Sequence, residues 1–354
     1  MKRVLVVVLA VAMILSMAAC GSEKPVNTGN APADTSNTPA DESFANNGKT
    51  YKWKCAVPNA SASIATDYAA LVAEKTDGRV TIETVDLAAL GGAADVLEMC
   101  RNGTMDMIVN SAAQTAGEFP VSDIIQVPFF FSSNDEAAST MWAMYEKGYM
   151  EEYNNQTHCL FLTTTDGQVM AFANKKVESM ADFAGMKLRV VSGTSVDMVD
   201  SFGASPVTMP TSDVYLSMST KVINGAVSSP LIILSNSLSD VSSYVCDYPL
   251  YFGSMYCLIN DDLWASLPAD LQDILLECGQ ERMAAESEKA ANRYEDNLKE
   301  IAAAGVEVYT PSEEFVAAMH EATDYLVDKY AETLSGLGYN GTEILQFAKD
   351  RIGK

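Results

Sequence analysis

From residue 51 onward, short β-type segments alternate with helical ones, and this order constrains the fold more than any other feature of the sequence. The first segment, Tyr51–Val57, alternates with a period of two, as a half-buried strand does. Helical patterns at 64–75 and 92–101 then alternate with β-rich patterns at 79–86 and 105–109. This order predicts an α/β fold with a parallel sheet and helices on both faces. Ligands of such sheets bind beyond the carboxyl ends of the strands, where Asn59, Asn110 and Ser111 are expected.

A second series of strand patterns begins after His158 and predicts a second lobe. It covers residues 159–164, 169–173, 186–191, 206–209 and 225–228, and strands near 244–246 and 254–259 lead back toward the first lobe. The stretch from 49 to 354 exceeds the roughly 250–300 residues at which a single core stops growing. We therefore expect one lobe from 49–166 plus about 255–294, and another from 167–254 plus about 295–354.

The segment from Pro268 to Ala304 has no proline after its start and is rich in Ala, Glu, Leu and Lys. It predicts one helix of about 37 residues, roughly 55 Å long, which is enough to span both lobes. Further on, Thr310-Pro311-Ser312-Glu313 has the pattern of a capping box with proline at the first helical position. A final helix is expected to begin there.

The amino-terminal residues have the pattern of an export signal. Lys2 and Arg3 precede an apolar run at 4–15, which ends in Met17-Ala18-Ala19-Cys20. The pattern resembles a bacterial lipoprotein signal at residues 1–19, after which Cys20 would become the lipidated first residue; an ordinary secretory signal is the alternative. Residues 20–48 are dominated by small and polar types and are expected to form a disordered tether. We expect the protein to work outside the cytoplasm, anchored by lipid to the outer face of the cell membrane.

Arg189 lies in the strand pattern Met186-Lys187-Leu188-Arg189-Val190, within a chain of formal net charge −24. The excess of 47 Asp and Glu over 23 Lys and Arg argues against nucleic acid and anionic lipid as partners. A guanidinium offers a rigid fork of donors that matches a carboxylate. From the strand alone, Arg189 either clamps an anionic small molecule or pairs with a neighbouring Asp or Glu.

Cysteine and histidine usage limits the chemistry. Beyond Cys20 there are six cysteines, which we predict to be buried free thiols, with disulfides as the alternative outside the cytoplasm: Cys55, Cys100, Cys159, Cys246, Cys257 and Cys278. The only histidines are His158 and His320, and neither CxxC nor HExxH occurs. This leaves little material for a histidine-based zinc site or a Ser-His-Asp triad, so we assign no catalytic residue, no metal ligand and no cofactor, while a metal ion that assists ligand binding stays open.

Taken in order, several stretches are similar to a known family. They are Glu74–Val80, Leu90–Gly92, Gly103–Asp106, Val127–Phe131, Phe183–Val190, Gly203–Val207, Met209-Pro210, Trp264–Pro268 and Leu271-Gln272. From Lys52 to about Met283 the chain resembles the extracytoplasmic solute-binding subunits of tripartite ATP-independent periplasmic (TRAP) transporters, the DctP type. The resemblance implies a two-lobed periplasmic-binding-protein-like fold with a ligand cleft between the lobes and a long helix that spans both. It also implies that Arg189 binds the carboxylate of a small organic acid, which membrane permease subunits then receive.

The departures from the family pattern concern the pocket. Many members carry a second arginine about twenty residues before the clamp, but Asp166–Met170 has no cation, and Gln168 is the candidate there. Thr211 replaces the family's aromatic residue, with Tyr215 following it, and the next polar contact falls at Ser228 or Ser229. A pocket with one arginine and otherwise neutral, hydroxyl-rich groups fits a monocarboxylate better than a dicarboxylate or a sialic acid.

Two other functions remain open at this point. One is a sensor that presents its bound acid to a membrane receptor. The other is an extracytoplasmic enzyme on a two-lobed scaffold. Against an enzyme, Gly203–Val207 lacks the last glycine of a GxSxG nucleophile elbow.

Overall fold

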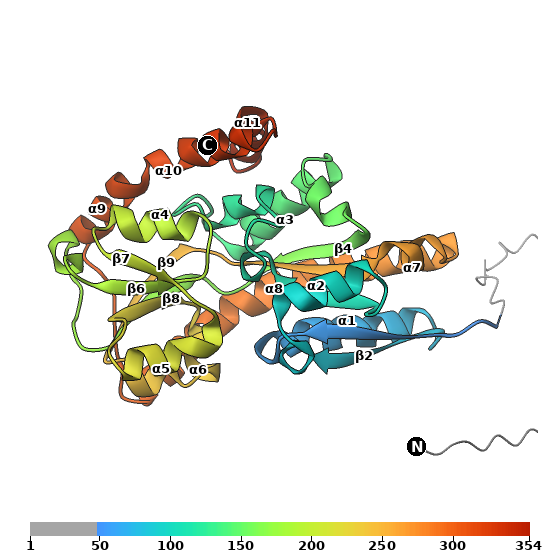
Figure 1. The fold of residues 1–354 in the computed structure, drawn as a ribbon, viewed down its shortest axis with the longest axis horizontal. Helices are drawn as coiled ribbons and strands as arrows, with labels where there is room; N and C mark the ends of the chain where they lie inside the picture. The colour runs from blue at the N-terminus through green and yellow to red at the C-terminus, as the bar shows by residue number, and fades with distance from the viewer. Residues whose placement is uncertain (1–47) are drawn as a thin grey trace, which may run out of the picture. The chain divides into compact units, whose positions relative to one another are not determined.

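The computed structural model describes residues 48–354, which form one compact unit with two β-sheets (Figure 1). The predicted signal peptide, Cys20 and nearly all of the predicted tether lie outside the described residues. Sheet A has the strand order β2 (Val80–Asp86), β1 (Tyr51–Val57), β3 (Met107–Ser111), β10 (Ser254–Asn260) and β4 (Thr157–Thr164). Sheet B has the order β11 (Glu307–Tyr309), β9 (Tyr244–Tyr251), β5 (Gln168–Phe172), β8 (Gly225–Ser228), β6 (Lys187–Val190) and β7 (Ser205–Thr208).

The three strands of the predicted βαβαβ order, β1, β2 and β3, pair in parallel as expected, and each sheet also contains one antiparallel strand. The strand β10 runs against β3 and β4, and β5 runs against β8 and β9. The cause is the path of the chain, which crosses from sheet A to sheet B between β4 and β5 and returns between β9 and β10. The strands β5 and β10 begin at the edge that faces the other sheet, so each runs antiparallel to neighbouring strands that end at that edge. The carboxyl ends of the parallel strands of both sheets therefore point toward these two crossings.

Helices cover both faces of both sheets, as the alternation predicted. They are α1 (Ala62–Lys75), α2 (Ala93–Arg101), α3 (Asn134–Glu146), α4 (Thr194–Ser201), α5 (Val214–Ser219), α6 (Pro230–Ser235), α7 (Asp261–Ala265), α8 (Ala269–Ala303), α9 (Glu313–Thr323), α10 (Tyr325–Gly336) and α11 (Gly341–Arg351). Four apolar clusters result, two against sheet A and two against sheet B. The α/β fold class predicted from the sequence is confirmed.

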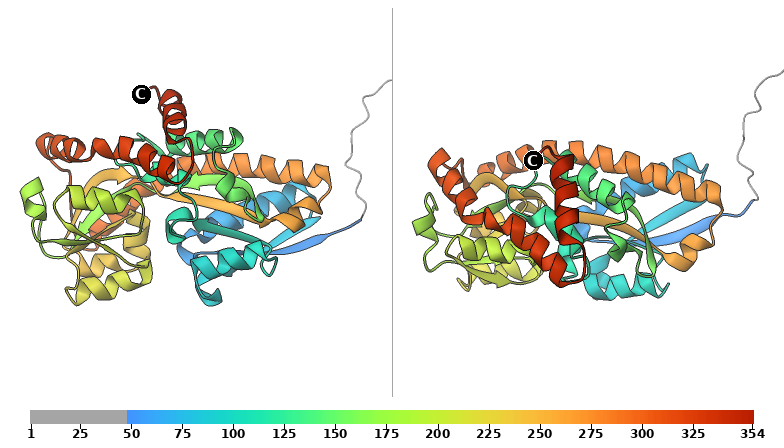
Figure 2. Two further views of the ribbon diagram at one scale, coloured as in Figure 1. Left: turned by 45° about the horizontal axis from the view of Figure 1, so that its top comes forward. Right: turned by 90° about the horizontal axis from the view of Figure 1, so that it is seen from above.

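The predicted long helix is present as α8, with 35 residues, and runs along both sheets (Figure 2). Its first part packs on α1 and β4, and its last part supplies Leu298 and Ile301 to a cluster of sheet B. Gly279 permits the close approach to β4, because a Cβ atom there would lie 2.3 Å from the carbonyl oxygen of Leu160. The single helix thus contributes to the cores on both sides of the crossings.

A chain of buried ion pairs fixes the middle of α8. Glu286, which is fully buried, accepts hydrogen bonds from Arg282 and from Arg293, the latter at 3.0 Å. Arg293 also donates twice, at 2.9 and 2.6 Å, to Oδ1 of Asp166 in the crossing between β4 and β5. Burial raises the pKa of Asp166, and the charge of Arg293 opposes that rise. The network joins the long helix to the segment in which the chain passes between the sheets.

Three helices follow β11, where the sequence predicted one, and the first begins later than expected. Ser312, rather than Thr310, is the N-cap of α9, since its side chain accepts a hydrogen bond from the backbone of Phe315 at 3.2 Å. Leu326 of α10 packs in a core of sheet B, whereas Tyr330, one turn later, packs in a core of sheet A. The α10 helix therefore also contacts both sides. The division into lobes at the residue boundaries given above remains a prediction.

The six described cysteines are all buried and unpaired, which confirms the prediction of free thiols. Between residues 48 and 354, no helix is apolar over a length sufficient to cross a membrane. Within the same residues, no group of three or more His, Cys, Asp or Glu side chains is arranged as a metal site.

Candidate functional site

The candidate site is the carboxyl edge of sheet B, where three neighbouring parallel strands end. These strands are β7, β6 and β8, and in their register Arg189 stands between Val207 and Ala226. Leu188 and Val190 point into one core of sheet B, so the side chain of Arg189 lies on the opposite face. Alternation along a strand thus places a charged group one residue from the carboxyl end of β6, the position at which α/β sheets bind ligands.

Neutral oxygen atoms hold the guanidinium of Arg189. Its Nε donates to the carbonyl oxygen of Met209 at 3.1 Å, and Nη1 donates to that of Val227 at 3.4 Å. The third bond runs from Nη2 to Oγ1 of Thr211 at 3.0 Å. Thr211 lies in the 3-10 helix η7 (Thr211–Asp213) just after β7, so the segment after β7, the strand β8 and one hydroxyl group orient the fork. Other N–H groups of the guanidinium remain for a ligand.

Arg189 is 1% exposed, and its side chain forms no ion pair with a carboxylate among the described residues. The alternative interpretation, a structural pair with a neighbouring Asp or Glu, is therefore excluded within residues 48–354. Burial lowers the pKa of Arg189 to about 10, so the group keeps its charge at neutral pH. A buried charge without a partner is unfavourable, and a bound anion would remove that cost.

Tyr251 is the titratable neighbour of Arg189 that the sequence analysis missed. It ends β9, opposite Gln168 in the register of β5 and β9, and is 6% exposed. Burial raises its pKa to about 12, against the opposing effects of Ser195 and of the charge of Arg189. Its hydroxyl group therefore stays protonated at neutral pH. No local pattern marks Tyr251, because only the pairing of distant strands brings it to this edge.

Several predicted site residues lie at the same edge. Ser228 ends β8 and pairs with Val169, so Gln168 lies beside it at the start of β5. The amide of Gln168 donates to Oγ1 of Thr165 and to the carbonyl oxygen of Asp166, each at 3.0 Å. Ser229, like Ser228, is 2% exposed, and it caps α6 by accepting a bond from Ile232. Arg189, Thr211, Gln168 and the two serines are thus brought together on sheet B.

The remaining predicted residues are more scattered. Asn110 is buried and Ser111 half-buried at the carboxyl end of β3 in sheet A, where Asn110 stands opposite Tyr256. Asn59 is exposed in the 3-10 helix η1 (Asn59–Ser61) just after β1. Tyr215 is 41% exposed on α5, beside the 66% exposed Leu216. The structure does not bring Tyr215 into contact with Arg189 through any hydrogen bond or ring contact of the described residues.

The turn after β6 contacts the sheet A side. Ser192 donates a hydrogen bond from Oγ to the carbonyl oxygen of Ala113 at 2.9 Å, just beyond the end of β3. Gly193 has a φ of 65°, and a Cβ atom there would lie 2.9 Å from Nε2 of Gln126 and 3.0 Å from Oδ1 of Asp123. Both of these side chains belong to the 3-10 helix η4 (Val121–Gln126). Glycine at 193 therefore allows the end of β6 to dock closely on η4.

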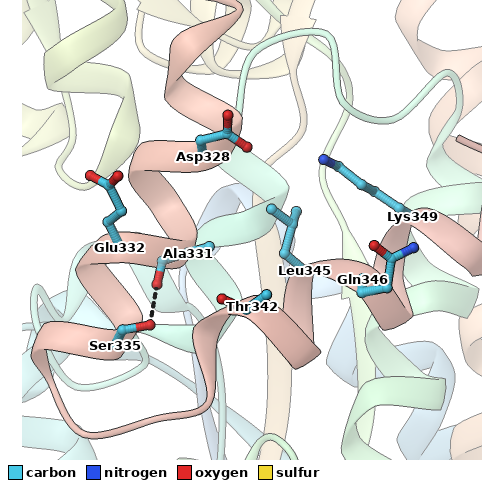
Figure 3. A pocket seen from close by; sticks show the side chains of 8 residues that line it. All are labelled: Asp328, Ala331, Glu332, Ser335, Thr342, Leu345, Gln346 and Lys349. Carbon is cyan, nitrogen blue, oxygen red and sulfur yellow. Dashed lines mark hydrogen bonds between the residues drawn. The ribbon is translucent and has the colours of Figure 1, made fainter.

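Two surface cavities lie elsewhere, and none of the predicted site residues lines them. One, of about 520 Å³, lies between α10 and α11 and is lined by polar groups such as Asp328, Glu332 and Lys349 (Figure 3). The other, of about 380 Å³, shares Asp328 and Lys349 with it and extends to Phe129 and His320. We place the candidate site at Arg189 because an unpaired buried charge is a stronger indication of a ligand than an open surface hollow.

Two α/β sheets joined by paired crossings and a shared long helix, with a buried cation at a carboxyl edge, define the class of two-lobed solute-binding proteins. Residues 59–333 match the family described as bacterial extracellular solute-binding protein, family 7, named DctP. The chain belongs to this family. Its members are extracellular solute-binding proteins, and those of TRAP transporters bind small carboxylate-type ligands and work with membrane permeases.

Similar proteins show the range of ligands within the family. The chain is 25% identical over 273 residues to the C4-dicarboxylate-binding periplasmic protein DctP of Rhodobacter capsulatus, covering 74% of this chain and 80% of the relative. It is 23% identical to the 2,3-diketo-L-gulonate-binding periplasmic protein YiaO of Escherichia coli, covering 68% and 74%. A TRAP solute-binding protein from an unidentified marine microbe, solved with 3-hydroxybenzoate, superposes with a TM-score of 0.80 at 21% identity, covering 86% and 98%.

Proposed function

We propose that this protein captures a small monocarboxylic acid outside the cell and delivers it to the membrane permease subunits of a TRAP transporter. The observation that carries the proposal is Arg189, a buried guanidinium whose described protein partners are all neutral. A carboxylate placed against the free side of this fork would complete a charge-assisted, bidentate pair.

The chemistry of the surrounding groups supports a ligand with one carboxylate. Thr211, Gln168, Ser228, Ser229 and Tyr251 are neutral, and Arg189 is the cation among these candidate residues. A second carboxylate in the same pocket would be desolvated without a matching charge, which is costly. The marine protein with 3-hydroxybenzoate and YiaO with 2,3-diketo-L-gulonate are similar proteins whose ligands have a single carboxylate.

Ligand capture is proposed to involve both sheets. Asn110 and Ser111 end β3, and Asn59 follows β1, so all three lie at the carboxyl edge of sheet A. Tyr215 lies on α5. These candidates can contact a ligand only from outside the group of residues around Arg189. A hinge motion that brings the two carboxyl edges together would enclose the acid and remove water from the ion pair, which strengthens it.

A thermal-shift screen tests the proposal on residues 49–354, since the described residues form one compact unit. We expect a monocarboxylic acid to raise the melting temperature, with about 2.7 kcal/mol of stabilisation at 100 times its dissociation constant. The matching amide should give no shift, because it lacks the charge that Arg189 requires. Dicarboxylates that stabilise the protein more than every monocarboxylate would overturn the proposed ligand class, and a panel without any stabilising acid would count against acid binding itself.

We also propose that Cys20 carries a lipid that holds the protein at the outer face of the membrane. The support is the pattern Met17–Cys20 behind an apolar run and ahead of a small-residue stretch. Replacing the thiol in Cys20→Ser removes the attachment atom, so the variant should appear in the soluble fraction or remain unprocessed. Membrane fractions probed with an antibody against the protein provide the measurement. Equal membrane retention of the variant and the parent would show that the anchor is wrong.

A further inference from the structure

We propose that Asp123 takes up a proton when the turn after β6 docks on η4, so that acid binding at the neighbouring Arg189 is coupled to pH. The inference rests on the proposed function, since it concerns the regulation of that same site. Nothing in the sequence pattern points to Asp123, which lies far from Arg189 along the chain.

The first support is the position of Asp123 at the contact between the two sides. Its Oδ1 accepts a hydrogen bond from Nε2 of Gln126 at 2.8 Å, and both atoms lie against Gly193. Gly193 is four residues after Arg189, and Ser192 bonds to Ala113 beside the end of β3. Asp123 is half-buried, so any motion that moves Gly193 away from it would expose its carboxyl group further to water.

The second support is the electrostatic surroundings of this carboxyl group. Asp123 has no cationic partner among the described residues, and Glu152, in the 3-10 helix η5 (Glu151–Asn154), is the nearby acid. Glu152 accepts bonds from the backbone of Val121 at 3.0 Å and of Ser122 at 3.2 Å, at the start of η4. The other titratable groups near these carboxyl groups are tyrosines. The hydroxyl of Tyr330 in α10 donates to the carbonyl of Val121 at 2.8 Å, the hydroxyl of Tyr153 lies 2.7 Å from that of Ser122, and Tyr339 lies beside Glu152. The charged groups on the facing helices, Asp197 of α4 and Lys329 of α10, pair with each other.

Asp123 within η4 and Glu152, which is bonded to the start of η4, thus lie near each other without a compensating cation among the described residues. Burial raises the pKa of Asp123 to about 7, against the bond from Gln126. Burial likewise raises the pKa of Glu152 to about 7, against its bonds to η4, and the charge of Asp123 adds to that rise. Protonation of Asp123 removes the repulsion between the two groups and the cost of a desolvated charge at the docked turn.

The sign of the coupling follows from linkage. A carboxyl group with a raised pKa in the docked state binds a proton more readily there than in a solvated state, where its pKa is near 4. Proton uptake by Asp123 therefore stabilises the docking of the turn after β6 on η4 at low pH. This stabilisation is lost as the pH rises through about 7. If the solvated pKa is 5 or lower, the linkage relation predicts about tenfold weaker acid binding at pH 8 than at pH 6. A carboxylic acid ligand and Arg189 both keep their charges over this range.

The test is calorimetric titration with 3-hydroxybenzoate, or with the strongest monocarboxylate of the screen, at half-unit steps from pH 6 to 8.5. The parent should lose about tenfold in affinity between pH 6 and 8, while Asp123→Asn, which keeps the shape but cannot ionise, should have a nearly flat profile. Glu152→Gln should reduce the slope by removing the coupled charge. The exposed Asp135→Asn on α3 is the matched control and should follow the parent. An Asp123→Asn profile as steep as that of the parent would overturn the inference.

A second measurement separates this inference from the proposed function. The free energy of unfolding of the ligand-free protein should fall between pH 6 and 8, and the fall should be smaller in Asp123→Asn. If no acid binds the parent at any pH, the proposed function fails, yet this ligand-free comparison still decides whether Asp123 takes up the proton. Identical unfolding profiles of the parent and Asp123→Asn would show that it does not.

Discussion

Replacing Arg189 by alanine should weaken binding of the acid by about a hundredfold or more. The variant loses a pair of hydrogen bonds to a charged group, each worth about 1.5–3 kcal/mol, and every 1.4 kcal/mol is a factor of ten in affinity. Arg189→Lys should recover only part of the loss, because an ammonium cannot reproduce the planar fork that Met209, Val227 and Thr211 orient. Calorimetry with the acid and its amide measures both effects.

The comparison with the amide makes the Arg189 experiment specific. The parent should bind the acid and reject the amide, whereas Arg189→Ala should lose most of this preference. Arg351→Ala, at the exposed end of α11, removes an arginine far from the site in sequence and should behave like the parent. Since Arg189→Ala also removes a buried charge without a carboxylate partner, the variant should remain folded. A folded Arg189→Ala protein that binds the acid as tightly as the parent would place the clamp elsewhere.

Replacing Glu286 by alanine should lower the free energy of unfolding by about 3–5 kcal/mol, the usual cost of removing one partner of a buried ion pair. Glu286 is fully buried and accepts bonds from both Arg282 and Arg293, so its loss leaves two guanidinium groups facing each other without an anion between them. The effect should be larger than that of an average substitution. Urea denaturation followed by circular dichroism gives the measurement.

The same helix offers a matched control. Glu295 of α8 is 77% exposed and lies 4.0 Å from Lys299, so Glu295→Ala should change stability by less than about 0.5 kcal/mol. Glu286→Gln keeps an acceptor for one arginine and should lose less than Glu286→Ala. Equal stabilities of Glu286→Ala and Glu295→Ala would mean that water or a rearranged Asp166 replaces the missing carboxylate.

Local patterns predicted much of this fold because they depend on near neighbours in sequence. The alternation at Tyr51–Val57 and the proline-free run after Pro268 each correspond to one element of the structure, β1 and α8. Arg189 was identifiable for the same reason, since a charge within an apolar strand is visible in five consecutive residues. The start of α9 was placed two residues early because Thr310 and Ser312 are both good N-caps, and only the structure shows that Ser312 accepts the bond.

The remaining features depend on pairings between distant segments. The antiparallel course of β5 and β10 follows from the two crossings, which no window of sequence reveals. Tyr251 comes near Arg189 through the register of β5 with β9, and Asp123 meets Gly193 through the docking of a turn. Tertiary packing determines which residues meet in such pairs. A local sequence pattern can therefore identify one residue of a contact, such as Arg189, but not its distant neighbour.

The six unpaired thiols of the described residues also determine how oxygen could inactivate the protein. Burial raises their pKa values, to about 11 for Cys278 and about 12 for Cys100 and Cys246, so almost none of the reactive thiolate exists in the native state. An oxidant can reach these sulfur atoms only during an opening of the core. We expect such an event to expose thiols of the opened core, and a disulfide formed between them to oppose its closing again. We therefore expect the working lifetime under oxygen to follow the rate of unfolding rather than the equilibrium stability.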